Sequence, residues 1–131
     1  MTPSRQYRPR VVLVDDHPSV LRAVSRLLES DCDVVARADN GLQAIDAVVM
    51  LKPDVMVVDL MMREMDGLEV CRRVKEVAPE TDVIISSALD DAHIEQSALE
   101  AGASALVAKF AASGALMSTI RRLTDKKQSG R

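Results

Sequence analysis

Acidic, hydroxyl and basic side chains follow short apolar runs at four places in this 131-residue sequence. These residues are Asp15 and Asp16 after residues 11–14, Asp59 after 55–58, Ser87 with Ser86 after 83–85, and Lys109 after 105–108. Three carboxylates held close together repel one another and favour a divalent cation. Mg²⁺ suits such a site because it binds through a few carboxylates, keeps several waters and accepts a phosphate oxygen.

The same residue types could also accept a phosphoryl group. A carboxylate can act as a nucleophile and form an acyl phosphate. Phosphoryl transfer needs mainly positioning and charge neutralisation, which Mg²⁺ would provide on one side and Lys109 on the other. The Ser87 hydroxyl could donate a hydrogen bond to a further oxygen, and the small Ala88 beside it leaves room for the group.

Each of these residues alone has an ordinary structural explanation. An Asp pair before a helix often caps it and interacts favourably with the helix dipole. An Asp before a loop, such as Asp59, is a common turn residue. Ser87 and Lys109 alone would be ordinary surface residues. The conjunction of matched groups at four strand ends is what favours a functional site.

Elements that would bring these residues together alternate along the chain. Five continuous apolar runs, typical of strands buried on both faces, are separated by stretches with helical periodicity. We expect turns at Asn40-Gly41 and Asp66-Gly67, a helix end before Pro53, and a helix C-cap at Gly102. This pattern predicts an α/β fold with five strands and five helices, and in such folds ligands bind at the carboxyl edge of the parallel sheet.

Length and composition limit the remaining possibilities. We expect one domain over residues 10–125, with an N-terminal tail over 1–9 and a polar tail or linker start over 126–131. A net charge of −3 gives no general attraction to nucleic acid or membranes. Cys32 and Cys71 lack the spacing of a zinc site or disulfide framework, and no apolar run is long enough to cross a membrane. We therefore expect a cytoplasmic protein with reduced cysteines.

From about Arg10 to Leu123 the sequence resembles the response regulator receiver family. The segments that carry the resemblance are Val-Leu-Val-Asp15-Asp16-His17-Pro18, Val-Val-Asp59-Leu-Met-Met, Met65-Asp66-Gly67, Ser87-Ala88, and Ala101-Gly102-Ala103 leading to Lys109. The resemblance implies a flavodoxin-like, doubly wound sheet with strand order 2-1-3-4-5. The Asp-Asp-His-Pro segment is similar to receivers that precede a helix-turn-helix DNA-binding domain, so nucleic acid would be contacted only through an additional effector domain.

The resemblance also implies a function and roles for individual residues. Asp59 would take a phosphoryl group from a histidine kinase or phosphotransfer protein, and the chain would not turn over small substrates as an enzyme. Mg²⁺ would be bound by Asp15, Asp16, Asp59 and the backbone carbonyl of Met61. Ser87 and Lys109 would sense the phosphoryl group and relay it to a surface formed by the fourth helix, fifth strand and fifth helix, through which family members often dimerise. His17 is expected to be a surface residue.

Several positions depart from the family pattern. Leu106 stands where an aromatic switch residue is common in the family, Phe110 follows Lys109 where the family usually has proline, and Arg63 stands where proline is common after the acceptor. Met61 and Leu89 are apolar at positions that flank the path of hydrolytic water, which predicts slow self-dephosphorylation.

Three alternatives remain open at this point. Leu106 and Phe110 favour a degenerate receiver that binds proteins independently of phosphorylation. A hydrolase of the aspartyl-phosphate type would need a second Asp where this chain has Met61. A nucleotide-binding α/β domain is disfavoured because the sequence contains neither GxGxxG nor a P-loop.

Overall fold

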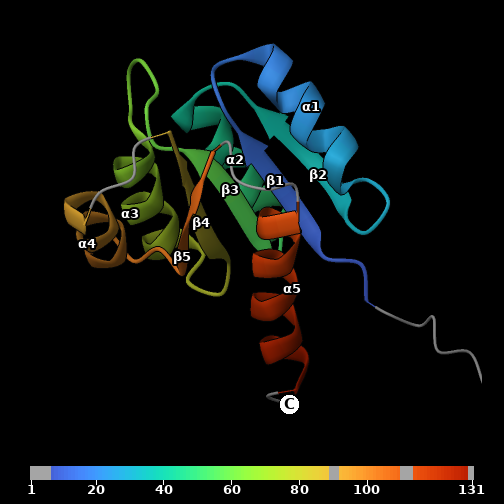
Figure 1. The fold of residues 1–131 in the computed structure, drawn as a ribbon. Helices are drawn as coiled ribbons and strands as arrows, with labels where there is room; N and C mark the ends of the chain where they lie inside the picture. Colours follow the sequence, from blue (N-terminus) through green and yellow to red (C-terminus); the bar gives the residue numbers. More distant parts are fainter. Residues whose placement is uncertain (1–6, 89–91, 110–113, 130–131) are drawn as a thin grey trace, which may run out of the picture.

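A computed structural model describes residues 7–88, 92–109 and 114–129 (Figure 1). Strands and helices alternate along the whole described chain. They are β1 (Arg10–Val14), α1 (Pro18–Leu28), β2 (Asp33–Ala38), α2 (Gly41–Leu51), β3 (Val55–Asp59), α3 (Gly67–Val77), β4 (Asp82–Ser87), α4 (Ala92–Glu100), β5 (Ala105–Ala108) and α5 (Gly114–Ser129). The α/β fold with five strands and five helices is thus confirmed.

The five strands form one parallel sheet in the order β2-β1-β3-β4-β5. This order is the one that the sequence resemblance implied. Because all strands run in the same direction, their carboxyl ends lie along one edge. At this edge Asp59 pairs with Ser86, and Ser87 pairs with Ala108.

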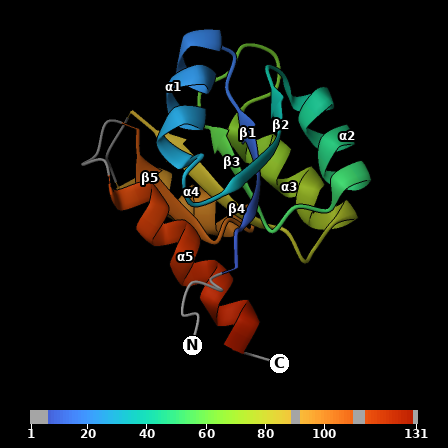
Figure 2. The ribbon, with the colours of Figure 1, turned by 90° about the vertical axis from the view of Figure 1, so that its right-hand side faces the viewer.

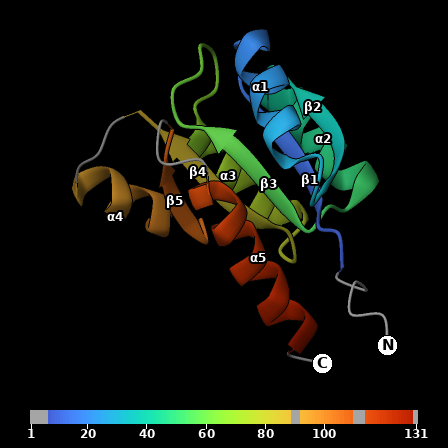
Figure 3. The same cartoon turned by 45° about the vertical axis from the view of Figure 1, so that its right-hand side comes forward.

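Alternate residues of the central strands pack into two separate apolar clusters, one on each face of the sheet. In β3, Val55 and Val57 contribute to the cluster under α1 and α5, whereas Met56 and Val58 contribute to the cluster under α2, α3 and α4. Figures 2 and 3 show α1 and α5 on one side of the sheet and α2 and α3 on the other. Burial on both faces explains why the strands are continuous apolar runs, and each fully buried Val contributes about 1.5–3 kcal/mol.

The two expected turns, at Asn40-Gly41 and Asp66-Gly67, lie at the N-termini of helices. Asn40 caps α2 by accepting a hydrogen bond from Gln43 N at 3.0 Å, and Asp66 caps α3 by accepting one from Glu69 N at 3.0 Å. Turns and helix N-termini favour the same residue types, which explains why the two were not distinguished. Gly102 follows α4 with φ +99°, as expected of a helix C-cap.

Residues near both ends of the described chain belong to the packed structure. Arg8 lies in the expected N-terminal tail, yet its guanidinium donates hydrogen bonds to the carbonyls of Glu29, Ser30 and Cys32 beyond α1. Helix α5 continues to Ser129, into the segment expected to be a polar tail or the start of a linker. No helix among the described residues has the length and apolar character that crossing a bilayer requires.

Candidate functional site

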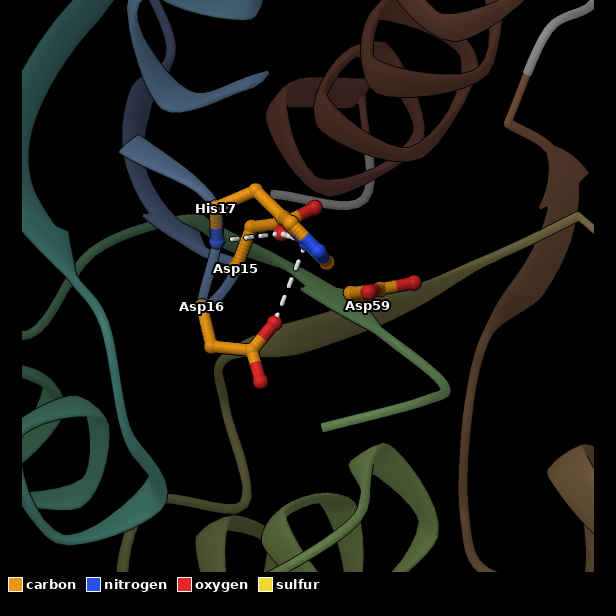
Figure 4. Close-up of side chains that lie close together, drawn as sticks. All are labelled: Asp15, Asp16, His17 and Asp59. Carbon is orange, nitrogen blue, oxygen red and sulfur yellow. Dashed lines mark hydrogen bonds and ion pairs between the residues drawn. The ribbon is translucent and has the colours of Figure 1, made fainter. Parts of the chain in front are cut away.

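Three carboxylates from two strand ends meet at the carboxyl edge of the sheet. Asp15 and Asp16 follow β1, Asp59 is the last residue of β3, and these neighbouring strands are hydrogen-bonded to each other. Figure 4 shows the three side chains together with His17. One ligand atom from each of these four residues lies within 4.8 Å of the others.

Lys109 joins this cluster from the end of β5. Its Nζ lies 3.0 Å from Asp15 Oδ2 and 3.1 Å from Asp59 Oδ2. The backbone N–H of Lys109 donates to the carbonyl of Ser87 at 2.8 Å, which fixes the start of the following loop to β4. Asp15 and Asp59 are both buried, at 5% and 4% exposure, so Lys109 supplies positive charge where solvent supplies little screening.

Burial dominates the electrostatics of Asp59. It raises the pKa of the Asp59 carboxyl above its ordinary value, and the nearby charge of Asp15 raises it further. The ammonium of Lys109 and the backbone N–H of Met61 oppose this shift. For Lys109 itself, burial alone would lower the pKa, but the carboxylates of Asp15 and Asp59 outweigh it and raise the pKa. The ammonium therefore stays charged at neutral pH.

One oxygen of Asp16 has the properties of an unused cation ligand. The Asp16 side chain is 10% exposed, and its Oδ1 has no hydrogen-bond partner among the described residues. Its Oδ2 accepts a hydrogen bond from the Arg63 backbone N–H at 3.2 Å. A buried, unsatisfied carboxylate oxygen is costly. The oxygen-rich donor set around it fits a hard divalent cation such as Mg²⁺.

The loop between β3 and α3 is held against the end of β3. Gly67 N donates to Leu60 O at 2.9 Å, and Leu60 N donates to Ser86 O at 2.8 Å. A Cβ on Gly67 would lie 2.6 Å from the carbonyl oxygen of Asp59, so the close approach of α3 requires glycine here. This contact fixes the backbone around Asp59 and Met61.

The other residues singled out in the sequence have different surroundings. Ser87 is buried at the end of β4, and Met61, two residues after Asp59, is 63% exposed. Leu106 is partly buried and packs against the apolar cluster under α2, α3 and α4. Leu89 and Phe110 lie outside the described residues.

The structure argues against the alternative that Asp15 and Asp16 serve only as a helix cap. The N-cap residue of α1 is His17, and no side chain makes a capping hydrogen bond there. His17 is exposed, as expected, but its Nδ1 also lies 3.0 Å from Asp15 Oδ1 and 3.1 Å from Asp16 Oδ1. Sequence reasoning missed this contact because it depends on a side-chain orientation at the turn into α1. In the sequence, the one feature that pointed to this contact was a histidine, a potential nitrogen ligand, directly after two aspartates.

Comparisons with known proteins agree with this arrangement. The family model described as "Response regulator receiver domain" matches residues 11–121. Response regulator MprA of Mycobacterium avium is 32% identical over 114 residues, which cover 87% of this chain and 50% of that protein. A protein-glutamate methylesterase/protein-glutamine glutaminase of Syntrophus aciditrophicus is 38% identical over 104 residues, which cover 76% of this chain and 30% of that protein.

A solved structure of another response regulator has the same fold as this chain. The LuxR-family two-component response regulator from Aurantimonas sp. SI85-9A1 superposes with a TM-score of 0.86 at 30% identity, covering 91% of this chain and 87% of that one. The chain spans half or less of the two curated relatives, so the similarity concerns their receiver part. The family match over most of the chain and the shared architecture lead to one conclusion: this chain belongs to the response regulator receiver domain family.

Proposed function

We propose that this receiver accepts a phosphoryl group on Asp59 from a phosphohistidine of a histidine kinase or phosphotransfer protein, with Mg²⁺ bound beside it. The observation that carries the proposal is the convergence of Asp15, Asp16, Asp59 and Lys109 at one edge of the sheet, where Asp16 Oδ1 is buried and accepts no hydrogen bond from the described residues. Asp15, Asp16, Asp59 and the Met61 backbone carbonyl would hold the ion. When bound, it would neutralise negative charge on the carboxylates and the phosphoryl oxygens.

The residues of the chain would carry out the transfer as follows. A carboxylate oxygen of Asp59 attacks phosphorus, a P–O bond forms, and the P–N bond to the donor imidazole breaks. The imidazole leaves with the electron pair. Lys109, already beside Asp59 Oδ2, moves to a phosphoryl oxygen, and the Ser87 hydroxyl donates to another.

Phosphorylation would then change the surface formed by α4, β5 and α5. The phosphoryl group adds about −1.5 to −2 charges at the end of β3. We propose that movement of Ser87 and Lys109 toward it shifts β5 and the helices that flank it, and that this shift favours a homodimer. Any output through DNA would need an effector domain in addition to the residues of this receiver.

Intact-protein mass spectrometry after incubation with acetyl phosphate tests the proposal. The wild-type chain should gain one phosphoryl group in the presence of Mg²⁺ and lose it in hydroxylamine, which cleaves acyl phosphates. Asp59→Asn should gain none, whereas Asp46→Asn on the exposed face of α2 should behave as wild type. Unlabelled wild type, or equal labelling of Asp59→Asn, would refute the assignment.

The degenerate receiver is a second candidate, and Leu106 is the observation that favours it. Leu106 packs against the apolar cluster under α2, α3 and α4. It has no aromatic ring whose reorientation could signal phosphorylation, as a switch residue at this position would. The same labelled samples distinguish the two candidates when their association state is measured by light scattering. A labelled chain whose association is unchanged would favour the degenerate receiver, and a labelled chain that dimerises would exclude it.

A further inference from the structure

The imidazole of His17 lies against the proposed metal ligands rather than in free solvent. Its Nδ1 is 3.0 Å from Asp15 Oδ1 and 3.1 Å from Asp16 Oδ1 (Figure 4). The His17 backbone N–H also donates to Asp15 Oδ1 at 2.9 Å, which holds the Asp15 carboxylate next to His17. One nitrogen and two carboxylate oxygens from three consecutive residues thus face one another.

The spacing of these atoms fits a common metal ion. Bonds of about 2.1 Å in octahedral geometry place neighbouring ligand atoms about 3 Å apart. The two distances from Nδ1 match this separation. Asp59 adds a fourth ligand atom within 4.8 Å.

The distribution of hydrogen bonds points to the same set of atoms. Lys109 contacts the Oδ2 atoms of Asp15 and Asp59, so the second oxygen of each carboxylate, Oδ1, is not taken up by this ion pair. Asp16 Oδ1 is buried and has no hydrogen-bond partner in the described part of the chain, although His17 Nδ1 is close to it. The hydrogen bond of that ring nitrogen goes to Asp15 Oδ1 instead.

We propose that His17 is a direct nitrogen ligand of this site, so that the receiver binds Ni²⁺, Co²⁺ and Zn²⁺ more tightly than Mg²⁺. This inference rests on the metal site of the proposed function. Imidazole suits these first-row transition metals, whereas Mg²⁺ prefers oxygen ligands and water. The ring would bind through an unprotonated Nδ1 with its proton on Nε2, in place of its hydrogen bond to Asp15.

Few other side chains of this protein compete for such ions. Cys32 and Cys71 are buried, and burial raises the pKa of each thiol to about 11, so both remain protonated at neutral pH. His93 in α4 is the one other histidine of the sequence, and it is exposed. It therefore provides a matched control.

Calorimetric titration of the full chain, purified without a histidine tag, tests the proposal. Wild type, His17→Gln and His93→Gln would each be titrated with Ni²⁺ and with Mg²⁺. His17→Gln should weaken Ni²⁺ binding by at least about tenfold, a loss seen even for groups that only orient a metal ligand. It should leave Mg²⁺ affinity within about twofold, and His93→Gln should change neither affinity.

Nitrogen NMR provides a readout that does not depend on affinity. With two histidines in the chain, the ¹⁵N signals of both imidazoles can be assigned, and Zn²⁺ should shift Nδ1 of His17 and leave His93 unchanged. Equal Ni²⁺ affinity of wild type and His17→Gln, or a zinc shift confined to His93, would overturn the inference. If that happens while Mg²⁺ still binds and Asp59 is still labelled, the proposed function stands. If the wild-type chain binds neither ion, the proposed metal site fails as well.

Discussion

At the scale of single residues, the cost of ionising Asp59 is the main physical feature of the site. Burial raises the pKa of Asp59, so the folded protein binds this proton more tightly than the unfolded chain does. The ionised carboxylate therefore lowers the stability of the fold at neutral pH. This destabilisation decreases as the pH falls through the raised pKa, and it is gone below the ordinary value of 3.8.

We predict that Asp59→Asn raises the melting temperature by a few degrees at pH 7 without divalent cations. The amide keeps the shape of the side chain and removes its charge. Asp46→Asn, at an exposed position of α2, should leave the melting temperature unchanged. The gain should shrink as the pH approaches 3. Differential scanning calorimetry measures the melting temperatures of the three proteins at each pH. A melting temperature of Asp59→Asn below that of wild type at pH 7 would show that the ionised Asp59 carboxylate does not destabilise the fold.

The lifetime of the phosphorylated state depends on Met61. Met61 is exposed two residues after the acceptor, and its thioether, a weak acceptor with no donor, does not orient an attacking water. We predict that Met61→Asn, whose amide can hold such a water, speeds loss of the acyl phosphate several-fold. Met50→Asn on α2, also highly exposed, is the matched control. Decay can be followed by mass spectrometry after acetyl phosphate is removed, and equal rates for the three proteins would rule out this role.

At the scale of elements, the contact between α3 and β3 positions the acceptor. A methyl group on Gly67 would meet the Asp59 carbonyl oxygen at 2.6 Å and Leu60 Cα at 3.0 Å, and neither backbone atom can move without disturbing the site. We predict that Gly67→Ala lowers the free energy of unfolding by about 1–3 kcal/mol, the usual cost of overpacking. It should also weaken Mg²⁺ binding.

Gly114→Ala is the control for that substitution. Gly114 begins α5, and a Cβ there would meet no described heavy atom within 4 Å. Alanine should therefore leave stability unchanged or raise it slightly. Urea unfolding and calorimetric Mg²⁺ titration of both variants check the prediction, which fails if Gly67→Ala retains wild-type stability.

The sequence predicts these elements better than their boundaries. Apolar runs and helical spacing are sufficient to predict the order of strands and helices. Residues 55–58, for example, are all buried, and a continuous apolar run predicts this without knowledge of which helix packs on each face. Asn40 and Asp66 were placed in turns because their local signals fit both turns and N-caps. The carboxylates and Lys109 could be placed at one edge because parallel strands share it. The orientation of the His17 ring toward Asp15 and Asp16 depends on its side-chain rotamer at the turn into α1, which the residue pattern does not encode.

At the scale of the whole molecule, Lys127 joins the end of α5 to the amino ends of β3 and β4. This edge of the sheet is opposite to the edge that carries the acidic site. The Lys127 Nζ donates to the carbonyls of Asp54 at 2.9 Å and Glu80 at 2.7 Å, and lies 3.1 Å from Asp82 Oδ2. These contacts explain why α5 continues beyond the expected end of the domain. They could not be predicted because they depend on how the end of α5 lies against the segments before β3 and β4, and no strand-end rule specifies that packing.

We predict that Lys127→Ala lowers the free energy of unfolding by about 1–2 kcal/mol, as expected for loss of charged hydrogen bonds. The last turn of α5 should then exchange its amide hydrogens faster. Lys126→Ala, which removes an exposed neighbour, should have little effect. Chemical denaturation and hydrogen exchange test this, and equal behaviour of the two variants would show that the contacts of Lys127 do not stabilise α5.

The most direct test of the central claim is fluorine NMR with beryllofluoride, a phosphoryl mimic that binds to an aspartate. Asp15, Asp16, Asp59 and Lys109 should act as one metal and phosphoryl site. A bound fluoride signal should appear with the wild-type chain and Mg²⁺. It should be absent without Mg²⁺ or in Asp59→Asn, and much weaker in Lys109→Met. A wild-type chain that gives no bound signal with Mg²⁺, or an Asp59→Asn variant that gives the same signal, would contradict the account.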